Sequence, residues 1–184
     1  YIYMGLGLGT TMGIVASIFH ILSHASTKSL LFIAGAGLTD ASGGSKKFED
    51  LTGSGFRHLA AGIAFTIGAC SMVGIPLFSG FISKMQFAEA AVQNSPAKML
   101  PTMICLAIST VLNAIYFMKT VIRLYTPASK KVRKTQAGEA AAVSMREHPL
   151  YHLALLCMVI LNVLLGCCSQ PIVDWITSGL SMFG

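Results

Sequence analysis

The sequence has few charged residues. Asp, Glu, Lys and Arg make up 11% of its 184 residues, and 54% are hydrophobic, whereas a typical soluble domain has about 25% charged residues. This shortage excludes an ordinary soluble domain and predicts a protein embedded in a lipid bilayer. Apolar stretches of about 20 residues, the length that crosses roughly 30 Å of hydrocarbon, occur near residues 13–38, 59–93, 99–125 and 149–169.

The apolar stretches lack the alternation of membrane-spanning strands. A transmembrane β-barrel needs alternating segments of about ten residues, but these stretches are long, unalternating and rich in Ala, Gly and Leu. We therefore expect an all-α polytopic membrane protein with about four spanning helices. Residues 1–10 have the composition of the end of a further helix, so we expect the chain to be the C-terminal part of a longer protein, with no signal peptide.

Cysteine occurs without a disulfide or metal-binding pattern. The five cysteines lie in apolar stretches without a CxxC pair, so we expect small core residues and no metal or cofactor site. Nucleotide-binding glycine fingerprints are also absent, and we find no soluble catalytic domain. The cysteines are Cys70, Cys105, Cys157, Cys167 and Cys168.

Acidic residues are fewer than basic ones, and the net charge is +6 at pH 7. A basic excess can indicate nucleic-acid binding. Here, however, most cations lie in two polar stretches between apolar runs, at residues 39–58 and 126–148. This placement is typical of the cytoplasmic loops of a membrane protein, so we expect no nucleic-acid partner.

Residues 59–93 are too many for one straight span and barely enough for two. GIPLFSG, at residues 74–80, lies near their middle. Pro76 lacks an amide donor and disfavours helix at the preceding residue, while Gly74 and Gly80 are flexible positions on either side. We expect the helix to break there, either as a turn between two short spans or as an interruption within one.

The distribution of positive charge favours one interrupted span. With a single crossing, both polar loops lie on the same side of the membrane, opposite Lys98; with two crossings the charge bias nearly vanishes. The positive-inside rule therefore predicts one broken helix and two cytoplasmic loops. The cations of these loops are Lys46, Lys47, Arg57, Lys130, Lys131, Arg133, Lys134 and Arg146.

FHILSHASTK, residues 19–28, places His20, His24 and Lys28 four residues apart in the first full span. This spacing keeps them on one helix face over about 12 Å. A Lys near the centre of a spanning helix costs about 2.5–3.5 kcal/mol, so Lys28 should face the protein interior. Because neutral His both donates and accepts a proton near neutral pH, we favour a proton path over simple hydrogen bonding between helices. No carboxylate or Cys on this helix lies at an offset that would complete a metal site.

Lys84 follows the expected break directly, near the middle depth of the membrane. Broken helices usually line water-filled cavities, so Lys84 is a second candidate for proton transfer; the alternative is a side chain that extends to the interface. Glu89 lies off the best pairing face and is expected at the interface. His58 follows Arg57 at the edge of a loop, where we expect it to be solvated.

Two linked motifs resemble a known family. FHILSHASTKSLLFIAGAGL, then a charged loop, then GACSMVGIPLFSGFISK resembles the C-terminal half of the antiporter-like proton-pumping subunits of respiratory complex I, Mrp-type cation/proton antiporters and membrane-bound hydrogenases. Ser29 replaces the Ala that is usual after the Lys. The matching positions are His20, His24, Ala25, Lys28, Leu31, Phe32, Ala34, Gly35, Gly74, Pro76, Gly80, Phe81, Ser83 and Lys84.

The resemblance implies a fold of two inverted repeats with a discontinuous helix in each, of which residues 1–184 hold most of the second. By position, Lys28 and its histidines would belong to a central hydrophilic axis, and Lys84 to a broken-helix site that links this axis to the far side. The family's first repeat, with its glutamate–lysine pair, and its long lateral helix have no counterpart here. Function would therefore depend on a missing N-terminal repeat.

The resemblance also implies a function. We expect a non-catalytic subunit of a redox-driven complex in a bacterial or archaeal inner membrane, assembled with other membrane subunits and passing H⁺ along His20, His24, Lys28 and Lys84. Two alternatives stay open. The chain could be a subunit of an Mrp-type Na⁺/H⁺ antiporter, or a structural membrane subunit that transports nothing.

Overall fold

The computed structural model describes residues 1–127 and 148–182, and all regular structure within them is helical. The prediction of an all-α protein is confirmed for this part of the chain. The helices are α1 (Ile2–Leu8), α2 (Thr11–Asp40), α3 (Ser54–Arg57), α4 (Leu59–Val73), α5 (Ser79–Val92), α6 (Pro96–Leu124), α8 (Pro149–Cys167) and α9 (Ser169–Ser181).

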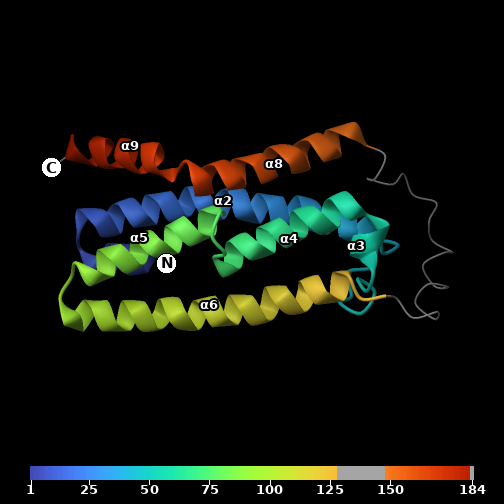
Figure 1. The fold of residues 1–184 in the computed structure, drawn as a ribbon, viewed down its shortest axis with the longest axis horizontal. Coiled ribbons are helices and arrows are strands. Elements are labelled where there is room, and N and C mark those ends of the chain that lie inside the picture. The colour runs from blue at the N-terminus through green and yellow to red at the C-terminus, as the bar shows by residue number, and fades with distance from the viewer. Residues whose placement is uncertain (128–147, 183–184) are drawn as a thin grey trace.

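The long helices run side by side along the longest axis of the molecule (Figure 1). The central helix is α2, which contacts α1, α4, α5, α8 and α9. The successive helices α4 and α5 lie end to end beside it, as do α8 and α9 (Figure 1). On the far side of α4 and α5 from α2 lies α6, at the edge of the bundle.

Small and apolar side chains allow these helices to pack closely around α2. Ala16, Phe19 and Leu30 of α2 are completely buried. Gly5 of α1 and Gly13 of α2 face each other so closely that a Cβ on either residue would overlap the backbone oxygen of the other. At its start, α2 is capped by Thr10, whose hydroxyl accepts a hydrogen bond from the Gly13 amide at 3.2 Å.

The segment between α4 and α5 interrupts the helical chain for five residues, 74–78. Gly74 ends α4 in the left-handed region with φ 92°, and Leu77 also has a positive φ, of 86°. Gly80 lies within the first turn of α5, where a Cβ would overlap the carbonyl of Ser71 in α4. The glycines therefore act differently: Gly74 permits the turn, and Gly80 permits the two half-helices to touch.

Among the described helices, α6 and α8 are long and apolar enough to cross a membrane. The first polar loop packs against the helix ends, because Arg57 donates hydrogen bonds to the carbonyl oxygens of Ala41 and Thr52, at 2.7 and 3.3 Å. Of the second predicted loop, residues 128–147 lie outside the described residues.

The expectation that His58 is solvated is wrong. His58 is 2% exposed, because it precedes α4 and its Nδ1 accepts a hydrogen bond from the Ala61 amide at 3.4 Å. Its ring also contacts the rings of Tyr151 and His152 in α8. The last residue of the predicted loop is therefore packed within the helix bundle.

Replacing Gly80 with Ala should destabilise the protein by about 1–3 kcal/mol, because the added Cβ would overlap the Ser71 carbonyl. The matched control is Gly35→Ala in α2, where a Cβ meets no atom within 4 Å. Thermal unfolding of the purified protein in detergent measures both variants. A Gly80→Ala protein that melts at the wild-type temperature would contradict the contact.

Candidate functional site

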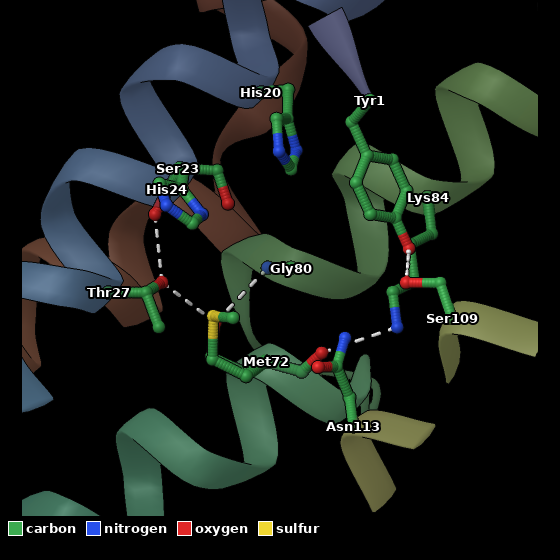
Figure 2. A pocket seen from close by; sticks show the side chains of 11 residues that line it. Tyr1, His20, Ser23, His24, Thr27, Met72, Gly80, Lys84, Ser109 and Asn113 are labelled. Carbon is green, nitrogen blue, oxygen red and sulfur yellow. Dashed lines mark hydrogen bonds between the residues drawn. The ribbon is translucent and has the colours of Figure 1, made fainter. Parts of the chain in front are cut away.

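A cavity of about 210 Å³ lies beside the gap between α4 and α5. Figure 2 shows His20 and His24 of α2 on one side of it and Lys84 of α5 on the other. Hydroxyl and amide side chains supply most of the other polar groups, and none of the described residues that line the cavity is an Asp or Glu. At about 30 Å³ per molecule, such a cavity has room for several waters.

Lys84 is held by neutral oxygens. Its Nζ donates hydrogen bonds to the backbone oxygens of Val73 and Met72, at 2.6 and 3.3 Å, and to Thr110 Oγ1 at 3.0 Å. An ammonium has three N–H donors, so these acceptors can satisfy all of them. Val73 and Met72 end α4, where free carbonyls carry the negative end of the helix dipole. The end of one half-helix therefore stabilises a positive charge carried by the other.

His20 has a fixed position in the cavity wall. Its Nδ1 lies 2.8 Å from the Oγ of Ser83, which is the residue before Lys84. The His20 ring stacks on the ring of Tyr1, with the ring centroids 4.7 Å apart. The His24 ring is 5.5 Å from that of His20. Through Nδ1, the imidazole of His20 is therefore linked to α5 by a hydrogen bond. The side chain of His24 is exposed and lies at the edge of the cavity.

The structure brings together three of the four residues predicted to transfer protons. His20, His24 and Lys84 line the same cavity, but Lys28 does not. Lys28 is half-buried, one turn beyond His24 on α2. The predicted ladder on α2 therefore leads up to the cavity, and Lys84 reaches it from the opposite wall (Figure 2).

A buried cluster of hydroxyl and amide groups, which we call the hydroxyl cluster, joins four helices at the break: Ser23, Thr27, Ser71, Ser79 and Asn162. Each is at most 2% exposed. Ser23 donates to Ser79 at 2.9 Å, and Thr27 and Ser71 oxygens are 3.1 Å apart. Asn162 Nδ2 of α8 donates to Thr27 at 2.7 Å. Two half-helices are thus tied to α2 and α8 by side chains.

Several of these polar residues were not found by sequence reasoning. Ser23 and Thr27 belong to the hydroxyls on the predicted ladder helix, but Ser71, Ser79 and Thr110 were missed. Asn162 was missed too, although it is a solitary amide in an otherwise apolar run and so had a readable signal. No group of three His, Cys, Asp or Glu side chains that could hold a metal ion occurs in residues 1–127 and 148–182.

The sequence is similar to a known family of membrane proteins and to several of its members. The family model described as "NADH:quinone oxidoreductase/Mrp antiporter, TM" matches residues 1–112. An uncharacterized protein of Methanocaldococcus jannaschii is 32% identical over 87% of this chain and 32% of its own length.

Other relatives have functional names. NADH-quinone oxidoreductase subunit N of Desulforudis audaxviator is 29% identical over 68% of this chain and 24% of its own length. Na⁺/H⁺ antiporter subunit A1 of Staphylococcus haemolyticus is 29% identical over 92% of this chain and 22% of its own length. The chain therefore spans no more than about a third of the length of the curated relatives it matches. For the M. jannaschii protein this share is 32%.

Replacing Thr27 with Val should destabilise the protein by about 1–3 kcal/mol, because the buried Asn162 amide loses its acceptor. The control is Thr120→Val in α6, which removes an exposed hydroxyl that donates only to the Tyr116 carbonyl one turn earlier. This change should alter stability by less than about 0.5 kcal/mol. Chemical denaturation in detergent compares the two. Equal effects would show that the hydroxyl cluster contributes no special stability.

Proposed function

The chain belongs to the NADH:quinone oxidoreductase/Mrp antiporter family of membrane proteins, and from this membership we propose that it is a proton-translocating subunit of a redox-driven membrane complex. The observation that carries the proposal is the position of Lys84. Its ammonium binds oxygens of α4 and α6 on the wall of a cavity that it shares with His20 and His24.

The proposed proton path follows α2 and then crosses the cavity. Protons pass from Lys28 to His24 and His20, whose rings lie 5.5 Å apart. A neutral imidazole can accept a proton at one nitrogen and release one from the other. Water in the cavity then carries the proton to Lys84. The contact between His20 Nδ1 and Ser83 Oγ, at 2.8 Å, supports this path because Ser83 is next to Lys84.

The protonation state of Lys84 affects how firmly the two halves of the broken helix are held together. While charged, its ammonium attracts the carbonyl ends of α4 at Val73 and Met72. A neutral amine has one fewer N–H donor and lacks the charge that favours this end of the helix dipole. Loss of the proton therefore weakens the link between the half-helices, and a movement of α5 would carry Lys84 away from its acceptors.

We further propose how the chain is assembled. It is the C-terminal part of an inverted-repeat protein, and an N-terminal repeat completes the hydrophilic axis near Lys28. Residues 59–93 form one interrupted span in a bacterial or archaeal inner membrane, with the loop at 39–58 cytoplasmic. The energy comes from electron transfer in partner subunits, as the relative named NADH-quinone oxidoreductase subunit N suggests.

The relative named Na⁺/H⁺ antiporter subunit A1 favours a second candidate, because its similarity extends over 92% of this chain. In that case the same cavity would serve the exchange of a cation for H⁺ without an electron donor. A structural subunit that transports nothing is the third alternative. In such a subunit Lys84 would be a half-buried charge whose removal stabilises the protein.

Replacing Lys84 with Ala should reduce proton translocation by at least about tenfold, because the group that takes up and releases the proton is lost. Electron transfer in the partner subunits should be partly retained. Proton uptake by reconstituted vesicles measures this effect, and Lys98→Ala, at the exposed start of α6, is the control. Full proton flux in Lys84→Ala vesicles would favour the structural alternative.

The two transport functions can be separated without mutation. In vesicles that contain the complete complex and a preformed pH gradient, but no electron donor, added Na⁺ should leave the gradient unchanged. A pH-sensitive dye reports the gradient, and an ionophore that exchanges Na⁺ for H⁺ is the positive control. Rapid collapse of the gradient on adding Na⁺ alone would replace the redox-driven proposal with the antiporter.

A further inference from the structure

One face of α6 is apolar and exposed along most of its length, and its described C-terminal end is cationic. Ile108, Leu112 and Ile115 are 55%, 61% and 62% exposed. Their spacing of four and three residues puts them on one face of the helix, and Lys119 follows four residues later on the same face. Figure 1 shows α6 at the edge of the bundle.

The cationic end of α6 is organised around an aromatic ring of the 41–53 loop. Lys119 Nζ lies 6.0 Å and Arg123 Cζ 5.3 Å from the centre of the Phe48 ring. Both distances are within the range of cation–π attraction. The ring therefore holds two positive groups together that would otherwise repel each other.

The loop that carries Phe48 is tied to the helix it contacts. The Gly53 amide donates a hydrogen bond to the Arg123 carbonyl at 3.3 Å, and Leu124 beside it is completely buried against Leu38 and Ala61. Arg123 Nε is buried and has no hydrogen-bond partner in the part of the chain that the structure describes. Because this nitrogen is itself shielded, an acceptor from outside these residues would bind the half-buried Arg123 side chain through its other nitrogens.

The surrounding charge determines the sign of that acceptor. Lys46 and Lys47 precede Phe48 and are exposed, and together with Lys119 and Arg123 they outnumber the acids of the loop, Glu49 and Asp50. Ser45 donates a hydrogen bond to Asp50 at 2.6 Å, so this carboxylate already has a partner within the loop. The patch therefore attracts an anion.

We propose that Lys119, Arg123 and Phe48 form a binding site for the headgroup of an anionic phospholipid, with its acyl chains along Ile108, Leu112 and Ile115. The phosphate would lie one helical turn beyond the apolar face, at the depth where a bilayer changes from hydrocarbon to headgroups. Anionic lipids attract cations at this depth by about 1 kcal/mol each. The site is separate from the cavity at Lys84 and does not depend on proton transport.

The test uses the full-length protein purified with its partner subunits in detergent. Dioleoyl-phosphatidylglycerol or dioleoyl-phosphatidylcholine is added, and native mass spectrometry counts the lipids that stay bound. The wild type should retain the anionic lipid preferentially. In Lys119→Gln/Arg123→Gln the affinity for it should fall about 30-fold, which corresponds to about 1 kcal/mol for each cation.

Two further variants separate a formed site from diffuse attraction. Phe48→Leu keeps every charge but removes the ring, and should weaken retention of the anionic lipid about threefold. Lys98→Gln removes one cation at the opposite, exposed end of α6, and should leave retention unchanged. Elution volume and melting temperature confirm that each variant is folded.

Three results would overturn the proposal. Equal retention of the two lipids by the wild type would show that the headgroup is not recognised, and a loss in Lys98→Gln as large as in the double variant would show only general charge attraction. A photo-reactive residue at Ile115 that crosslinks to a protein subunit instead of lipid would assign this face to a protein interface. Crosslinking to lipid supports the site.

Discussion

The contact between the Lys84 ammonium and the terminal carbonyls of α4 is the interaction on which the broken helix depends. An interrupted helix exposes unpaired carbonyls at the end of its first half, and within a membrane these need donors. Lys84 supplies them at 2.6 and 3.3 Å from the second half. The half-buried ammonium of Lys84 in turn needs acceptors. Each half-helix thus satisfies a requirement that the other creates, and none of the described residues that line the cavity is a carboxylate.

Close backbone contact and buried hydroxyls support this central interaction. Gly80 brings the start of α5 against the Ser71 carbonyl, and Gly166 of α8 brings a third backbone against Leu77 in the break itself. The hydroxyl cluster then connects these surfaces with short side chains, which lose little conformational entropy when they are fixed. Small residues and hydroxyls therefore form the contacts at the break, while large apolar side chains such as Phe19 and Leu30 fill the interior elsewhere along α2.

The helical class, the membrane environment and the family were predictable, because they depend on long apolar runs and on two motifs with specific local spacing. The placement of His20 and His24 on one face likewise follows from helix geometry alone. The partners of Lys84 could not be predicted in this way. Thr110 is 26 residues away in the chain, and nothing in its local pattern indicates that α6 turns this side chain toward α5. His58 shows the same limit, since contacts with α8 bury a residue that its neighbours mark as part of a loop.

The lengths of the two half-helices bear on how the protein enters a bilayer. With 15 and 14 residues, α4 and α5 are each shorter than the about 20 residues that cross the hydrocarbon alone, so neither is an independent insertion unit for the translocon. Ribosomal synthesis supplies α2 first, and with it Ser23 and Thr27, which later accept or donate hydrogen bonds at the break. The side chains that the interrupted segment contacts are thus synthesised before that segment emerges.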